Sequence, residues 1–362
     1  MTSQQFIASL QAESEKKNCD FRPLYKQIES WHHEGNAHAL LETARYGAQA
    51  ANQWKFSWLF KHIVSAVALG RGAQNLDLLF QILDFLPQDE KEITQMITQN
   101  HELPELLTLF ENREKWAQDR EFLAVLTQLF VLRKHDVRST IAEQFWNSEI
   151  VQNHDLKSLP LTLLPAEKKL ARWLPMYGAG GMSWSGGDAV SASITKGEAV
   201  EAERIEEDVS RIRAVVQSWE DESNGSSEAA IFRLHRVLDV HHFGTQTLRS
   251  LPMESLRDAD EEIALEHCHF EGALSELFNA ACHGGAYSSG EGGAYARLKS
   301  WRALGALCGC GSDDIAFIAQ NAENSAWFRF RAHGDWFICY VGVLCLRADG
   351  KTLAVLCATD ND

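Results

Sequence analysis

The chain has 362 residues, of which 45% are hydrophobic and 10% aromatic, and its formal net charge is -16. This length exceeds the size at which single cores stop growing, so two domains are expected, and the composition is that of a folded protein. With 50 acidic residues against 34 basic ones, a general binder of nucleic-acid backbones, which needs a basic surface, is disfavoured.

Amphipathic helices are predicted over most of residues 1–176. Apolar residues recur at helical spacing, as Leu24, Ile28 and Trp31 do in the first clear case, and glycines or prolines separate the segments. Predicted helices span residues 21–33, 37–51, 54–69, 76–86, 90–99, 103–110, 116–132 and 137–146. Because no sequence signature recurs at a fixed period, we predict an irregular, solenoid-like helical array and no named repeat.

Residues 177–197 change in composition, with six glycines in a serine-rich background. Such a stretch cannot hold a helix. It is therefore either a linker or an ordered loop that lets the backbone approach another group closely. Met182 and Trp184 in its middle favour partial order, because pure linkers rarely carry an exposed indole.

Residues 198–362 are predicted to form an α+β domain. Helices are expected at 198–219, 228–242, 260–282, 295–308 and 313–320. Three apolar or alternating runs follow, at 327–332, 336–346 and 352–359, and the Asp-Gly pair at 349–350 predicts a hairpin turn between the last two. The fold class is thus mostly α, with helices packed on a small antiparallel sheet at the C-terminal end.

The segment from His283 to Trp301 contains two copies of Gly-Gly-Ala-Tyr and leads into a helix. A glycine-rich turn that opens a helix can bind an anion, so His283, Tyr287, Tyr295 and Arg297 are candidate ligand-binding residues. The lysine of a phosphate loop and the third glycine of a dinucleotide fingerprint are both missing. The alternative is a tight corner between two helices, where glycines avoid a clash.

Two further chemical sites are considered. His235, Asp239 and His242 stand at i, i+4 and i+7, so one helix face could present a metal-binding trio, although a histidine at a helix end is a common plain alternative. Cys282 and His283, with His267 or His269, could form a thiol site. The eight cysteines include no Cys-x-x-Cys pair, which favours reduced, buried thiols, and no cofactor is expected.

The C-terminal part carries a resemblance. The sequence Gly284-Gly-Ala-Tyr, followed by Gly292-Gly-Ala-Tyr-Ala-Arg-Leu, Trp301 and the ending Leu353-Ala-Val-Leu-Cys-Ala-Thr-Asp, resembles the C-terminal signature of an uncharacterised bacterial protein family. The resemblance implies a bacterial source and a genuine domain from about residue 198. It implies no activity, so no catalytic residue follows from it.

The leading functional hypothesis is a non-enzymatic interaction protein of the bacterial cytoplasm, of an immunity or regulatory type. No export signal and no apolar run of membrane-spanning length occur, and the negative charge favours a basic protein partner. The alternative hypothesis is an enzyme or small-molecule binder with an anion-compatible pocket at Gly284–Arg297.

Overall fold

The computed structural model describes residues 1–16, 18–49, 54–84, 90–178, 181–183, 196–257, 263–332 and 339–361. The chain divides into two compact units. The N-terminal unit comprises Met1–Leu126, Ser139–Phe145 and Met176–Ser183, and the C-terminal unit comprises Thr127–Arg138, Trp146–Pro175 and Trp184–Asp362. This division differs from the boundary predicted at residue 176, because residues 127–138 and 146–175 cluster with the helices of the C-terminal unit.

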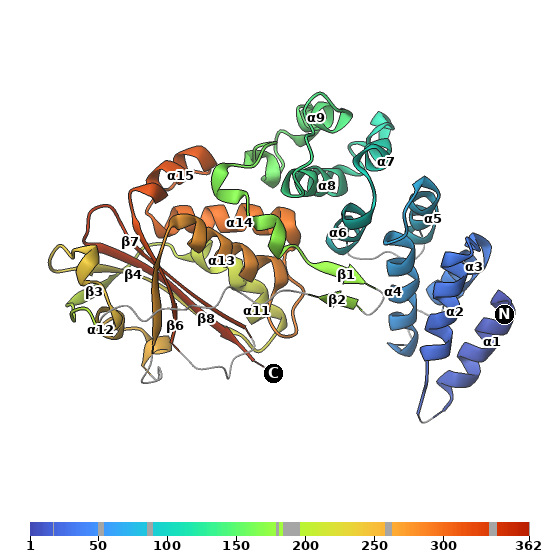
Figure 1. Ribbon diagram of the computed structural model, residues 1–362, viewed down its shortest axis with the longest axis horizontal. Helices are drawn as coiled ribbons and strands as arrows, with labels where there is room; N and C mark the ends of the chain where they lie inside the picture. The colour runs from blue at the N-terminus through green and yellow to red at the C-terminus, as the bar shows by residue number, and fades with distance from the viewer. Residues whose placement is uncertain are drawn as a thin grey trace. The chain divides into compact units, whose positions relative to one another are not determined.

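Helices dominate the N-terminal unit, as the apolar periodicity predicts (Figure 1). Helix α1 packs on α3, α2 on α4, α3 on α5 and α4 on α6, so each helix meets the next but one. This is the stacking of an irregular solenoid-like array. The helices are α1 Ser3–Ser14, α2 Arg22–His33, α3 Ala37–Gln49, α4 Trp54–Ala68, α5 Ala73–Leu83, α6 Glu90–Asn100, α7 Leu103–Leu107, α8 Arg120–Leu132 and α9 Ile141–Trp146, with 3-10 turns η1 Thr108–Phe110 and η2 Arg113–Lys115.

A two-stranded hairpin occupies the start of the glycine- and serine-rich stretch. Strand β1 (Met176–Gly178) pairs antiparallel with β2 (Gly181–Ser183). The side chain of Gln99 on α6 both donates to and accepts from the backbone of Tyr177, each at 2.8 Å. The first part of the predicted linker is therefore ordered against the helices. The middle of the stretch, from 184 to 195, lies outside the described residues.

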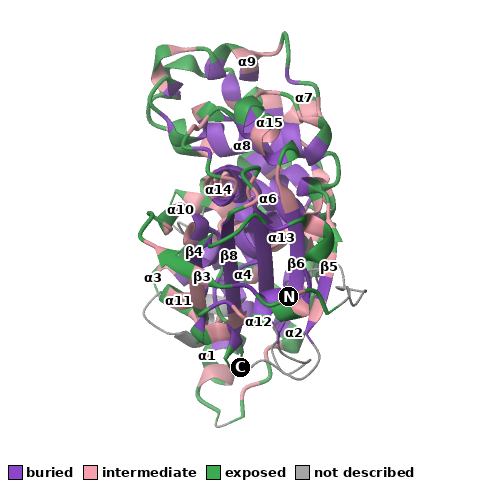
Figure 2. Ribbon diagram, turned by 90° about the vertical axis from the view of Figure 1, so that its left-hand side faces the viewer, coloured by how far each residue is buried: buried purple, intermediate pink, exposed green. Residues whose placement is uncertain are grey.

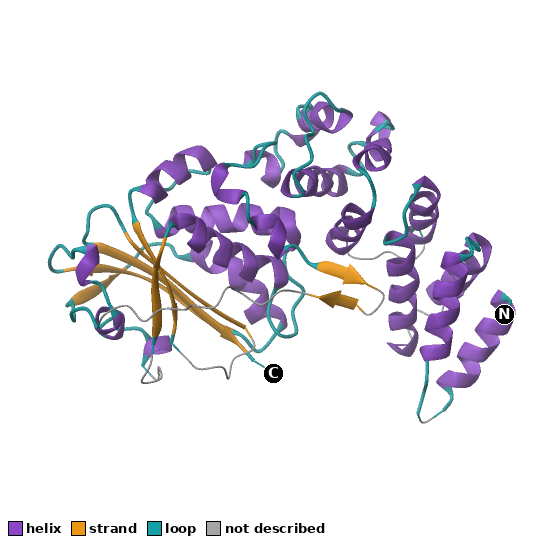
Figure 3. Ribbon diagram, viewed as in Figure 1, coloured by secondary structure: helices purple, strands orange, loops and turns teal. Residues whose placement is uncertain are grey.

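The C-terminal unit contains a six-stranded antiparallel sheet in the order β3-β4-β8-β7-β6-β5 (Figure 3). The strands are β3 Ala202–Ile205, β4 Ser226–Leu234, β5 Ala264–Cys268, β6 Ala326–Arg331, β7 Cys339–Leu346 and β8 Thr352–Asp360. The last three occupy the runs predicted as strands, and β7 and β8 form the predicted hairpin around the Asp-Gly turn. An α+β domain after a helical region is therefore confirmed.

Three segments predicted as helices contain the other strands, so those predictions are corrected. Residues 198–219 include β3 and only short helical turns, residues 228–242 form most of β4, and residues 260–282 begin with β5. In β4 the four residues Ala229–Phe232 are all buried, because the strand lies between β3 and β8 and is covered on both faces. Ile231 and Leu234 share helical spacing only by coincidence.

Two layers cover the sheet. Helices α13 (Phe270–His283) and α14 (Gly292–Leu307) pack together, and α13 contacts β6 and β7, as expected for the helices around the glycine stretch. On the other face, Phe243 stacks on Phe328 with ring centroids 4.1 Å apart. Figure 2 shows the central strands buried along their length. The remaining elements are η3 Glu149–Val151, η4 Asp155–Ser158, η5 Pro165–Glu167, η6 Leu170–Trp173, α10 Ser210–Arg213, η7 Ala214–Val216, α11 Gln217–Glu222, η8 Val240–His242, α12 Thr245–Arg249, η9 Glu254–Leu256 and α15 Ile315–Glu323.

Candidate functional site

The glycine corner, residues 284–291, joins α13 to α14. A Cβ added at Gly290 would lie 2.1 Å from the carbonyl oxygen of Cys282, which no real contact permits, and Gly284 has a φ of +78°. Glycine is thus required where the loop crosses the end of α13. This geometry is that of the tight helix–helix corner considered as the alternative.

The backbone N–H groups of the glycine corner do bind anionic groups, but these belong to the chain itself. The N–H of Ala286 donates to Oδ2 of the buried Asp360 at 2.6 Å, and the N–H of Ser289 donates to Oε2 of Glu222 at 3.3 Å. Tyr287 donates its N–H to Oγ of Ser223 at 3.1 Å. The N–H groups that could have bound an anionic ligand therefore bind carboxylates of the chain itself. These hydrogen bonds attach the corner to the end of β8 and to α11.

The four residues predicted to bind a ligand at the corner have different environments. Tyr287 is 61% exposed and Tyr295 is half-buried, whereas His283 is 3% exposed and Arg297 is completely buried. Arg297 faces away from solvent and is committed to an internal ion pair. It is unavailable to a ligand at the corner, which corrects the expectation that it contributes to an anion pocket.

Arg297 forms a buried polar network with Glu167, and neither side chain is exposed. Its Nε and Nη2 donate to Oε1 and Oε2 of Glu167 at 2.6 and 2.8 Å, and Nη1 donates to Oε1 of Gln128 at 2.6 Å. Trp301 donates its indole N–H to the same Glu167 at 2.8 Å. The network joins α8, η5 and α14, so it links three separate elements of the C-terminal unit.

Burial also decides the chemistry of Cys282 and His283. Burial raises the pKa of the Cys282 thiol far above its usual range, so this thiol is not a nucleophile at neutral pH. The pKa of His283 is lowered by burial to about 4, which leaves the imidazole neutral near pH 7. Cys282 and His283 are therefore buried core residues and do not act as a nucleophile and its base.

The depressed pKa of His283 predicts a pH dependence of stability. An unfolded histidine titrates near 6.5, so between that value and about 4 the unfolded chain binds an extra proton. Stability from the neutral imidazole is complete above about pH 6.5 and is lost as the pH falls towards 4, by on the order of 3 kcal/mol. Urea unfolding of wild type and His283→Gln at pH 7 and pH 4.5 tests this. Equal losses in the two proteins would contradict it.

The residues of the predicted metal trio are not on one helix face, because the segment is not a helix. His235 follows β4 and its Nδ1 lies 3.1 Å from Oε2 of Glu201, while Asp239 caps η8 by accepting the N–H of His241 at 2.9 Å. His242 lies 3.9 Å from Glu198. Within the described ranges, no group of three or more histidine, cysteine or acidic side chains is arranged to hold a metal ion.

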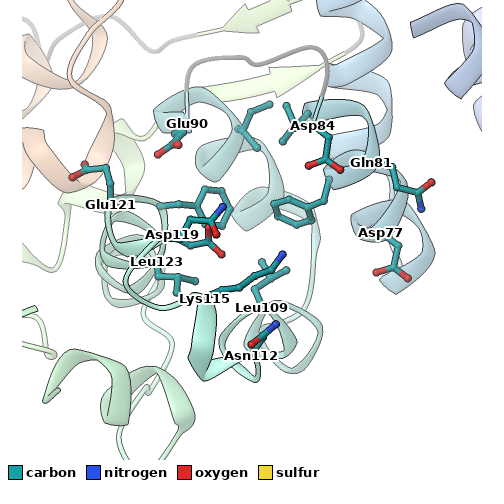
Figure 4. A pocket seen from close by; sticks show the side chains of 15 residues that line it. Asp77, Gln81, Asp84, Glu90, Leu109, Asn112, Lys115, Asp119, Glu121 and Leu123 are labelled. Atoms are coloured by element: carbon teal, nitrogen blue, oxygen red, sulfur yellow. The ribbon is translucent and has the colours of Figure 1, made fainter. Parts of the chain in front are cut away.

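A cavity that was not predicted from the sequence lies within the N-terminal unit. It has a volume of about 800 Å³ and is open to solvent (Figure 4). We call it the acidic cavity. Its lining comes from α5, α6, η1, η2 and the start of α8: Asp77, Phe80, Gln81, Leu83, Asp84, Glu90, Ile93, Leu109, Asn112, Lys115, Gln118, Asp119, Glu121, Phe122 and Leu123.

Helix α5 buries one face in the core and lines the acidic cavity with another. Leu76, Leu79 and Ile82 are buried in the core. Asp77, Phe80, Gln81 and Asp84 recur at i, i+3, i+4 and i+7, so they form one stripe on another side of the helix. Figure 4 shows Asp84 directed into the cavity, with Asp77 and Gln81 nearer its rim.

The lining of the acidic cavity combines apolar and acidic side chains. The rings of Phe80 and Phe122 meet edge to face with centroids 5.7 Å apart. Among the described residues, five carboxylates and one ammonium, that of Lys115, line it. Asp77 and Asp84 form no ion pair with any residue that the structure describes. The described lining of the cavity thus carries more negative than positive charge.

The comparisons with known proteins give one result. The profile of a family of unknown function, DUF6183, matches residues 22–362. The chain belongs to this family. No curated protein matches the chain significantly, and neither does any solved structure. In this DUF6183 member, the described part of the chain holds no helix with the length and apolar character that a membrane crossing needs.

Sequence reasoning missed the acidic cavity for a physical reason. Acidic residues are so numerous in this DUF6183 chain that their pairs carry little information. A usable signal was nevertheless present in α5, where an aromatic residue, Phe80, stands among Asp77, Gln81 and Asp84 on a face opposite the leucines.

Proposed function

We propose that this protein is a non-enzymatic bacterial interaction protein, of the kind that neutralises or regulates a protein partner, and that the acidic cavity receives a basic side chain of that partner. The combination of carboxylates and apolar side chains in the lining of this cavity is the observation that carries the proposal. A lysine or arginine side chain has an apolar stem and a cationic head, and so matches a cavity lined by both apolar and acidic side chains.

The charge of the whole chain supports the same choice. A net charge of -16 attracts a basic partner over a distance set by the ionic strength and so raises the rate of encounter. At the glycine corner, by contrast, Arg297 is internal and the N–H groups are engaged by Asp360 and Glu222. The alternative of an enzyme or small-molecule binder at Gly284–Arg297 is therefore less favoured.

Neutralising two carboxylates of the acidic cavity tests the proposal. We expect the double variant Asp77→Asn/Asp84→Asn to weaken partner binding roughly tenfold at low salt, because two attractive charges are removed. Folding should be unimpaired, since Asp84 lies at the C-terminal end of α5, where a negative charge opposes the helix dipole. Co-purification from the source cells identifies the partner, and titration of the purified partner gives the affinity.

A matched control separates the cavity from overall charge. Glu111→Gln/Glu114→Gln removes two exposed charges from the same unit without touching the cavity lining. The control should keep wild-type affinity at low salt. An equal loss of affinity in both double variants would contradict the acidic cavity as the binding site. A protein that co-purifies with a small molecule but with no stoichiometric protein partner would contradict the proposed function itself.

A further inference from the structure

The C-terminal unit holds a second, smaller cavity whose charge is opposite to that of the acidic cavity. Its volume is about 390 Å³, and it lies between the end of α8 and residues 161–168. We call it the basic cavity. Its polar lining consists of Lys134, His135, Asp136, Arg138, Thr162 and Lys168, and its remaining walls are aliphatic.

Two lysines give the basic cavity its net charge. Arg138 holds Asp136 with two hydrogen bonds, from Nε to Oδ1 at 2.8 Å and from Nη2 to Oδ2 at 2.6 Å, so this pair is neutral overall. Arg138 also lowers the pKa of Asp136 to about 2, which keeps the pair ionised. Neither Lys134 nor Lys168 forms an ion pair within the described part of the chain. Two positive charges are left without a carboxylate.

Lys134 has a left-handed backbone conformation, which glycine adopts more easily than lysine does. Helix α8 ends in a Schellman motif, in which the N–H of His135 donates to the carbonyl of Phe130 and the N–H of Lys134 to that of Val131, both at 2.9 Å. Lys134 occupies the position where glycine is usual, with a φ of 66°. Only Ser139 shares a positive φ among the non-glycine residues described. A cationic residue thus occupies a position where glycine fits better.

The opposite wall of the basic cavity is held by the buried network. Arg297 donates to the carbonyl oxygens of Pro160 at 3.1 Å and of Thr162 at 3.2 Å. Glu167, which accepts from the same guanidinium, directly precedes Lys168. The loop that carries Thr162 and Lys168 is therefore fixed before any ligand arrives, which lowers the entropic cost of binding.

We propose that the basic cavity binds a dianion of the phosphate class, either inorganic phosphate or a phosphate monoester. Two uncompensated ammonium groups match two negative charges, whereas a carboxylate would leave one of them without a partner. The hydroxyl of Thr162 adds a donor on the same lining. The volume of the basic cavity has room for a phosphate ion or for a phosphate monoester.

Calorimetric titration of the full chain with inorganic phosphate at low ionic strength tests this proposal. We expect saturable binding that Lys168→Gln weakens roughly fivefold or more, as the loss of one charge implies. Lys169→Gln is the matched control, because Lys169 is an exposed neighbour outside the lining, and it should bind as wild type does.

Lys134→Gly separates binding from folding. It should weaken phosphate binding by a similar factor and yet raise the midpoint of thermal unfolding, because glycine suits the positive φ at the end of α8. Titration with phosphoserine identifies the source: tighter binding than phosphate indicates an ester, and weaker binding indicates the free ion. Absence of saturable phosphate binding, equal losses in Lys168→Gln and Lys169→Gln, or equally tight binding of acetate would each overturn the proposal.

Discussion

Arg297→Ala is expected to destabilise the C-terminal unit by about 3–5 kcal/mol, which is the range for breaking a buried ion pair. The substitution leaves the carboxylate of Glu167 buried without its cation, with the indole N–H of Trp301 and the backbone N–H of Leu164 as its remaining donors. It also removes the donors to Gln128 and to the carbonyls of Pro160 and Thr162. Urea unfolding followed by circular dichroism measures the loss.

Two companion variants identify the cause of this loss. Replacing both charges, as in Arg297→Met/Glu167→Leu, should recover much of the stability, because no unpaired charge then remains in the core. Arg302→Ala, on the same helix, removes a half-buried arginine that lies 3.5 Å from Asp313 and should cost no more than about 1 kcal/mol. If Arg297→Ala costs no more than Arg302→Ala, the network does not hold the unit together.

Gly290→Ala is expected to cost about 3 kcal/mol, at the upper end of the range for overpacking. The added methyl group would meet the oxygen of Cys282 at 2.1 Å, its carbonyl carbon at 2.4 Å and the nitrogen of Gly284 at 2.7 Å. All three are backbone atoms, so the clash is relieved only by moving the end of α13 or the loop. Thermal unfolding of the variant measures the effect.

Gly311→Ala is the control for the corner. A Cβ at Gly311 meets no atom within 4 Å, so alanine should leave stability unchanged or raise it slightly. A melting temperature for Gly290→Ala equal to that of Gly311→Ala would contradict the close crossing at the corner. A loss confined to Gly290→Ala supports the view that the glycines serve packing.

Secondary-structure elements are predicted well from the sequence where the pattern of apolar residues fits only one type of element. In the first 132 residues, apolar stripes such as Leu24, Ile28 and Trp31 end at glycine or proline, and a helix is the one structure that buries them together. Strands β7 and β8 are similarly clear, because continuous apolar runs flank an Asp-Gly turn.

Strands β3, β4 and β5 were predicted as helices because their surroundings, and not their residues, decide their structure. Ala229–Phe232 is buried on both faces only because β8 lies on one side of β4 and β3 on the other. Their apolar residues also fit a helical period, so local pattern alone favoured the wrong structure. Pairing with a strand about 130 residues away overrides local preference.

The sequence by itself determined the helices of the N-terminal array and the C-terminal hairpin, because each depends on neighbours within a few turns of chain. Only the tertiary structure decided which charged residues are paired in the interior and which line a cavity. Arg297 and Glu167 are 130 positions apart, and only folding brings them together. In this ion pair Arg297 is no longer available to a ligand at the glycine corner. Folding likewise gathers Asp84 and Asp119 into one cavity and leaves Lys134 and Lys168 facing another, since electrostatic sites depend on distances in space.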